Sequence, residues 1–153
     1  MQWRASDFAV IGLLALLAAG TALLQNIERP VPLAQSDMEI RHVISQQIEA
    51  FRNDRHAAAF GMAAPELQDQ FGTPDDFIDM VRQHYRPVYR AQNHDFLGPA
   101  KTVAAHREMR IQRVFITDDR GTAHQARYIM QKQPDGSWKI AGCYLLGSPQ
   151  LEI

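Results

Sequence analysis

The residues whose side chains could carry out chemistry lie beyond residue 40 of the 153-residue chain. Six histidines occur between His42 and His124, but no two have the close spacing, such as HxH or HExxH, that a metal site uses. The one cysteine, Cys143, has no disulfide partner and no base paired with it in the sequence. Phosphate-binding loops, GxSxG elbows and glycine-rich dinucleotide motifs are also missing. We therefore expect no metal, no cofactor and no catalytic residue, and we interpret Cys143 as a small buried hydrophobe.

Tyrosine and arginine side chains are the candidates for ligand binding. Arg113 lies on the same face of a predicted strand as Ile111 and Phe115, so we expect it to point inward. The alternative is a position at the rim, with the arginine stem lying on apolar surface. Tyr128 and Tyr144 also fall on strand faces that we expect to point inward. The predicted ligand-binding residues are Tyr89, Arg90, Arg113, Tyr128 and Tyr144.

Helical signals come first in the part of the chain that carries these residues. Apolar residues recur with helical spacing from Ile40 to Phe51, and Ser36 or Asp37 is placed to cap the helix. The alanine-rich stretch 56–64 predicts a short second helix that Pro65 ends.

A third helix start is followed by a change to strand patterns. Thr73-Pro74-Asp75-Asp76 combines a capping threonine, a proline suited to the first turn and two acids that favour a helix N-terminus. We expect Pro87 to end that helix. Beyond it, alternating patterns bounded by Asp-Arg-Gly and Pro-Asp-Gly turns predict antiparallel strands at 102–117, 124–133 and 137–146. Helices followed by a strand meander indicate an α+β fold, with a curved sheet on a helical layer that encloses a core or a cone-shaped cavity.

The N-terminal segment has a different character. Residues 8–24 form a run of 17 uncharged, mostly apolar residues. The length of this run is intermediate between that of a signal-peptide core and that of a short membrane helix. We expect a membrane anchor or a cleaved signal in 1–25, an extended proline-containing linker in 26–36 and one domain in 37–153. The run from Phe8 to Leu24 predicts contact with the membrane. Either interpretation sends the domain across the inner membrane, which predicts a periplasmic or exported domain in a bacterial envelope.

Charge is segregated along the predicted domain, although the whole chain has a net charge of -1. Residues 37–81 contain nine acidic and three basic residues, whereas 82–132 contain ten basic and four acidic ones. The near-neutral total argues against a nucleic-acid partner. The basic half either meets an anionic ligand or phospholipid, or attracts the acidic helical layer.

Several stretches in order carry a resemblance to a known family. They are IEAFR at 48–52, FGTPDDF at 71–77, MVR at 80–82, YRPVYR at 85–90 and DGSWKIAGC at 135–143. The domain resembles the bacterial family labelled domain of unknown function 4864, within the nuclear-transport-factor-2-like superfamily, also called SnoaL-like or cystatin-like. The resemblance implies a fold of helices on a curved antiparallel sheet. It leaves the activity open, because the family has no assigned one.

Three functions fit these features. We favour a non-catalytic envelope module that binds a protein partner or a small apolar or anionic ligand. The resemblance also suggests an isomerase or dehydratase of the ketosteroid-isomerase kind, in which an acid, here Asp95, would act with a tyrosine. A homodimer that pairs sheet faces is the third alternative.

Overall fold

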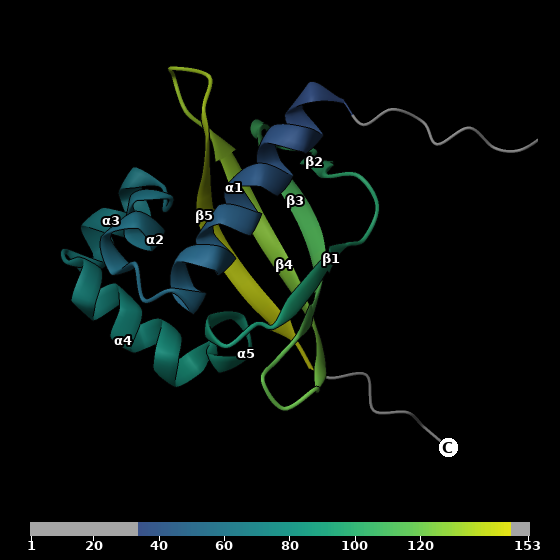
Figure 1. Cartoon of the computed structure of the whole chain (residues 1–153). Helices are drawn as coiled ribbons and strands as arrows, with labels where there is room; N and C mark the ends of the chain where they lie inside the picture. Colours follow the sequence, from purple (N-terminus) through teal and green to yellow (C-terminus); the bar gives the residue numbers. More distant parts are fainter. Residues whose placement is uncertain (1–33, 148–153) are drawn as a thin grey trace, which may run out of the picture. The chain divides into compact units, whose positions relative to one another are not determined.

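The computed structural model describes residues 34–147 of the chain (Figure 1). Within this range, helices and an antiparallel sheet pack together as an α+β domain. The helices are α1 (Gln35–Arg52), α2 (His56–Gly61), α3 (Pro65–Phe71), α4 (Pro74–His84) and α5 (Arg86–Tyr89). The strands are β1 (Asn93–Phe96), β2 (Lys101–Val103), β3 (His106–Thr117), β4 (Ala123–Lys132) and β5 (Trp138–Leu146). Figure 1 shows α1 lying against the sheet and the shorter helices grouped beside β5.

Helix α1 contributes a row of buried isoleucines to the core. Its buried residues Ile40, Ile44 and Ile48 recur every four positions and are at most 1% exposed. The helix begins at Gln35, and its N-cap Ala34 makes no side-chain capping bond, so the predicted cap at Ser36 or Asp37 is wrong. The buried Asp37 carboxylate instead accepts a hydrogen bond of 3.2 Å from the backbone N–H of Ala100, which ties the helix to the loop before β2.

Two prolines begin helices that the sequence pattern did not assign to them. The preceding helices do end before these prolines, α2 at Gly61 and α4 at His84. Pro65 and Pro87 themselves lie in the first turns of α3 and α5, two helices that the sequence pattern did not predict. Proline suits a first turn because the N–H that it lacks has no partner there. The start of α4 is as predicted, since the Thr73 hydroxyl accepts a hydrogen bond from the Asp76 N–H at 3.2 Å.

The sheet is antiparallel, with strand order β1-β3-β4-β5 and with β2 also paired to β3. Strands β3 and β4 place Val114 opposite Ala126 and Gln112 opposite Tyr128. The Asp118 carboxylate fixes the turn between them, because it accepts hydrogen bonds from the N–H groups of Arg120 and Thr122 at 2.9 Å. Strands β1 and β2 were not predicted as separate elements. They are short and lie at the sheet edge, where a strand can consist of polar residues and so lacks an apolar pattern.

One face of the sheet closes the core against the helices. Its fully buried residues alternate along the strands, as the pleat requires. They are Gln112, Val114 and Ile116 of β3 and Ala126, Tyr128 and Met130 of β4, all 0% exposed. The predicted inward direction of the β4 face that carries Tyr128 is therefore confirmed, whereas the buried face of β3 is the one opposite to the face predicted from Ile111 and Phe115.

The N-terminal segment lies outside the described residues, as do most of the predicted linker and the last six residues of the chain. Within the described range, no helix has both the length and the apolar character needed to cross a membrane.

Candidate functional site

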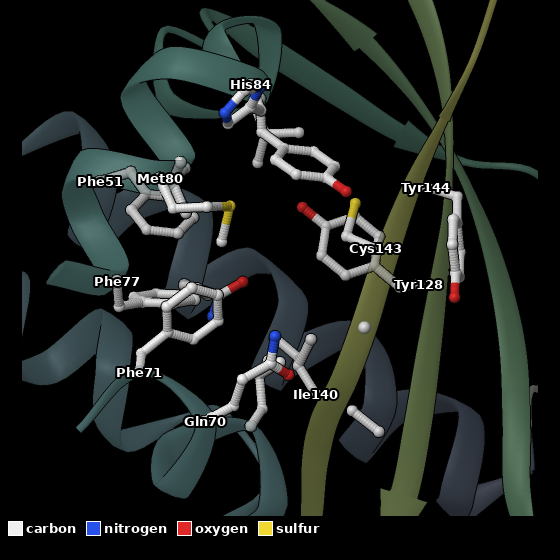
Figure 2. Close-up of a pocket in the computed structure, with 17 residues that line it drawn as sticks. Phe51, Gln70, Phe71, Phe77, Met80, His84, Tyr128, Ile140, Cys143 and Tyr144 are labelled. Atoms are coloured by element: carbon white, nitrogen blue, oxygen red, sulfur yellow. The ribbon is translucent and has the colours of Figure 1, made fainter. Parts of the chain in front are cut away.

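A cavity of about 660 Å³ lies between the helices and the last two strands. Helices α1, α3, α4 and α5 form one wall, and β4 and β5 form the other (Figure 2). Its lining combines aromatic, aliphatic and sulfur-containing side chains with a few neutral polar groups. The lining residues are Gln47, Phe51, Leu67, Gln70, Phe71, Phe77, Met80, Val81, His84, Tyr85, Val88, Tyr128, Ile140, Ala141, Gly142, Cys143 and Tyr144.

A β-bulge shapes the strand wall of the cavity. Met130 pairs with Ile140 and Ile129 pairs with Gly142, so Ala141 is an extra residue in β5. The extra residue reverses the alternation of side chains beyond it. Ile140 points into the core before the bulge, and Cys143 packs against the core after it.

The helical wall is held in place by aromatic contacts. The Phe77 ring of α4 packs against Phe51 of α1, Phe60 of α2 and Phe71 of α3, with ring centroids 6.3, 5.6 and 5.6 Å apart. Phe77 and Phe51 are 4% and 2% exposed. Aromatic contacts of this kind stabilise the fold beyond the burial of the rings. The position of the helical wall is therefore fixed by packing in the core and not by a loop.

The Tyr128 hydroxyl is the most unusual polar group of the lining. Tyr128 is 0% exposed, and its hydroxyl oxygen is buried without a hydrogen-bond partner of normal geometry. Its neighbour is the thiol of Cys143, which stands opposite Tyr128 in the strand register. Figure 2 shows the hydroxyl directed from β4 toward the cavity, with the Cys143 sulfur beside it and Met80 across from it. Burial, together with the nearby Cys143, raises the pKa of Tyr128 well above its usual range.

Two further groups near Tyr128 also stay protonated. Burial raises the pKa of the Cys143 thiol to about 12. Burial also raises the pKa of Tyr85, with smaller contributions from Cys143 and Tyr144. Beside Tyr128, the cavity therefore presents the phenol hydroxyls of Tyr85 and Tyr128 and the Cys143 thiol, all neutral near pH 7.

The lining carries no strong charge. Among the described residues that line the cavity there is no aspartate, glutamate, lysine or arginine, and His84 is its one histidine. Asp95, the acid predicted for an isomerase, is exposed on β1 and is not part of the lining. The acid–tyrosine pair that proton-transfer chemistry would use is thus not assembled in this cavity. In residues 34–147, no three histidine, cysteine, aspartate or glutamate side chains gather closely enough to hold a metal ion.

With this geometry established, comparison with known families identifies the domain. A family model described as "Domain of unknown function (DUF4864)" matches residues 33–153. The chain belongs to this family. The resemblance to this family drawn from the sequence motifs is therefore confirmed, and the matched segment begins one residue before the described residues of the DUF4864 domain. No curated protein matched the chain.

The DUF4864 domain brings only part of the predicted ligand-binding set to the cavity. Tyr128 lies in the wall, as expected from its strand face. Tyr144 borders the cavity but is 59% exposed, so its predicted inward direction is wrong. The bulge at Ala141 is the physical reason, because it turns the odd-numbered side chains of β5 inward from Cys143 onward.

Tyr89 and Arg90 lie outside the cavity lining of the DUF4864 domain. The Tyr89 hydroxyl donates a hydrogen bond to Asp54 at 2.5 Å and accepts one from Arg82 at 2.9 Å. The Arg90 guanidinium lies over the Tyr89 ring, 5.2 Å from its centroid. These contacts satisfy the polar atom of Tyr89 within the protein.

Arg113 points to the other side of the sheet. It is exposed on β3 and stands opposite Arg127, and its predicted inward direction is wrong. Both faces of β3 carry apolar residues, so alternation alone did not decide which face is buried. The buried polar residue of that strand is Gln112, whose amide nitrogen donates hydrogen bonds to the carbonyls of Gly98 and Arg113.

Sequence reasoning missed several cavity residues of the DUF4864 domain. Phe71, Met80 and Tyr85 come from α3, from α4 and from the junction of α4 with α5. The helical spacing of Phe77, Met80 and Val81 marked an apolar face, but only the tertiary packing shows that part of this face borders a cavity. The prediction that Cys143 is a small buried hydrophobe is met in part, because Cys143 packs against the core but is only partly buried.

Proposed function

We propose that the domain is a non-catalytic binding module that holds a small, largely apolar molecule in the cavity beside β5. The observation that carries this proposal is the cavity itself, with its aromatic lining and its buried Tyr128 hydroxyl, which has no hydrogen-bond partner of normal geometry. Its volume of about 660 Å³ falls within the usual range for small-molecule sites, roughly 300–1,000 Å³. An apolar lining with a few oriented polar groups is the usual composition of such sites.

Variants at the mouth of the cavity test this proposal. Gln70 on α3 is exposed and lines the cavity, whereas its neighbour Asp69 is exposed and does not. A Gln70→Trp side chain is expected to block entry, and Asp69→Trp adds the same bulk outside the lining. Binding of a panel of uncharged aromatic molecules, followed by ligand-detected NMR, should weaken severalfold in Gln70→Trp and remain in Asp69→Trp. Equal binding by both variants, or no binding by the unchanged protein, would contradict the proposal.

The proposal includes a location at the bacterial envelope. It is supported by the uncharged run at 8–24 and by Arg4, which precedes the run as a positive flank would. In this view the segment anchors the domain to the inner membrane or directs its export, and the ligand is met outside the cytoplasm. Fusion of a reporter that is active only in the periplasm to the C-terminus tests this location. An inactive fusion, together with activity of a second fusion whose reporter works only in the cytoplasm, would contradict it.

We also propose that the domain belongs to the nuclear-transport-factor-2-like superfamily, with a cone-shaped, cystatin-like arrangement of sheet and helices. The α+β architecture and the antiparallel order of the sheet are compatible with this assignment. An experimental structure that superimposes on that superfamily over both the sheet and α1 would support it, and a different path of the chain would contradict it.

A second candidate function is self-association through the outer face of the sheet. Tyr144 is 59% exposed there, and the neighbouring Ile111, Phe115 and Ile129 are only half-buried. Exposed aromatic surface beside apolar side chains is typical of protein interfaces. Sedimentation of the protein over a range of concentrations should then show a dimer that Tyr144→Asp dissociates. A monomer at all concentrations would exclude this candidate.

A further inference from the structure

The Tyr128 hydroxyl has a position that core packing does not explain. Its ring packs among fully buried residues, where phenylalanine would make the same apolar contacts. Its oxygen is buried without a hydrogen-bond partner of normal geometry, and the Cys143 thiol, a weak donor and acceptor, is the polar group beside it. Burying a hydroxyl without such a partner is unfavourable, because the hydrogen bonds that it makes to water in the unfolded chain are lost and not replaced. The hydroxyl borders the cavity, so a molecule in the cavity is the partner that its position suits.

The groups around this hydroxyl define what a ligand atom would meet. Cys143 stands opposite Tyr128 across the β4–β5 pair, and Tyr85 lies near Cys143 from the helical side. Their protons are retained near pH 7, because burial raises the pKa of the thiol and of both phenols. The ligand therefore meets neutral O–H and S–H groups here, of which the two phenols are the stronger donors.

The charge of the lining limits the ligand further. An anion buried at Tyr128 would lose its hydration, and the described lining holds no lysine or arginine to compensate it. A cation would meet no carboxylate in that lining. The atom that suits the donors and the absence of charge is an uncharged acceptor oxygen, as in a ketone, an aldehyde, an amide or an ester.

We propose that the cavity selects uncharged ligands that place a carbonyl-type oxygen against the Tyr128 hydroxyl, which donates a hydrogen bond to it, with Tyr85 as a second donor. This inference rests on the proposed function, because it needs the cavity to admit a small molecule. It adds the chemical class of the ligand and the residue that recognises it.

Three probes of nearly equal shape test the inference. 2-Acetylnaphthalene carries a ketone oxygen, 2-ethylnaphthalene lacks any oxygen, and 2-naphthoate carries a negative charge. Titration into the domain from residue 33 to 153, followed by protein NMR, gives an affinity for each. This segment is suitable because the core residues all lie in it and the family match covers it. We expect the ketone to bind about tenfold more tightly than the hydrocarbon, as one hydrogen bond allows, and more tightly than the carboxylate.

Matched variants assign the preference to one hydroxyl. Tyr128→Phe should reduce the difference between ketone and hydrocarbon to about twofold or less, because one donor has been removed. Tyr85→Phe should reduce it partly. Tyr89→Phe removes a hydroxyl outside the lining and should leave the preference unchanged.

The outcomes separate the two proposals. Equal binding of ketone and hydrocarbon by the unchanged domain would overturn the inference and leave the binding function standing. Tightest binding by the carboxylate, or an unchanged ketone preference in Tyr128→Phe, would also overturn the inference. Absence of saturable binding by all three probes would count against the binding function itself, and the inference would fall with it.

Discussion

Replacing Tyr128 by phenylalanine should leave the domain as stable as before or make it more stable. The substitution keeps the ring, which is 0% exposed, and removes a hydroxyl that has no hydrogen-bond partner of normal geometry. Leaving a buried polar group unsatisfied costs about 1–3 kcal/mol. Part of that cost is offset by the neighbouring Cys143 thiol, so the expected gain in the free energy of unfolding is between zero and about 1 kcal/mol.

The same substitution at Tyr89 supplies the comparison. The Tyr89 hydroxyl is bonded to both Asp54 and Arg82, so Tyr89→Phe removes two hydrogen bonds. Solvent near these two partners replaces part of the loss, and we expect a decrease of about 1 kcal/mol in the free energy of unfolding. Both tyrosines are at least 98% buried, which makes the ring contribution of the two substitutions similar.

Urea unfolding of the 33–153 domain, monitored by circular dichroism, measures both changes at one temperature. A change of 1 kcal/mol corresponds to roughly 4 °C in Tm for a domain of this size, so thermal unfolding gives a second readout. If Tyr128→Phe lowered stability by as much as Tyr89→Phe, the Tyr128 hydroxyl would have a partner in the folded protein. The reasoning that assigns it to a ligand would then be refuted.

The other predictions concern the thiol, alkaline pH and the β3–β4 turn. Burial raises the pKa of Cys143 from 9.0 to about 12, so iodoacetamide should modify the folded chain about a thousandfold more slowly than the urea-unfolded chain at pH 8, as intact mass measurement over time would show; equal rates would contradict this burial. Because the folded pKa of Cys143 is raised, its contribution to stability is present below pH 9 and is lost as pH rises from about 9 to 12, by up to about 1.4 kcal/mol per pH unit. The raised pKa of Tyr128 adds a loss in the same direction that begins only above pH 10. Cys143→Ala should flatten this dependence in urea unfolding at pH 8 and pH 10, and an identical slope would argue against it. Asp118→Ala removes the acceptor of two backbone N–H groups and the partner of His124, and it should lower the free energy of unfolding by about 1–3 kcal/mol. Asp119→Ala in the same turn removes the same charge but only the partly exposed ion pair with Arg86, and it should cost about 1 kcal/mol or less; equal losses in the two variants would contradict the role of Asp118 in the turn.

The elements with strong local signals could be predicted from the sequence. The Thr73-Pro74 start of α4 was predicted because a capping side chain and a first-turn proline act through the nearest backbone alone. The buried face of β4 was predicted because Ala126, Tyr128 and Met130 alternate with residues of more polar character. In both cases the local pattern agrees with the tertiary contacts.

The features that build the cavity depend on longer-range contacts. The extra residue Ala141 is recognisable only from the pairing of β5 with β4, and this residue decides that Cys143 faces the core while Tyr144 faces outward. The start of α3 at Pro65 was misread because a proline can follow one helix or begin the next. Backbone bonds between this segment and Ile140 of β5, at 2.8 and 2.9 Å, fix the choice, and they join residues far apart in the sequence.

The most direct test of the binding account is the position of 2-acetylnaphthalene on the domain. Intermolecular nuclear Overhauser effects from the acetyl methyl group would locate the probe. The account predicts contacts to the Tyr128 ring and to the Met80 methyl group, on the two walls of the cavity. Contacts only to Arg113 or Arg127 on the outer face of the sheet, or none at saturating probe, would contradict it.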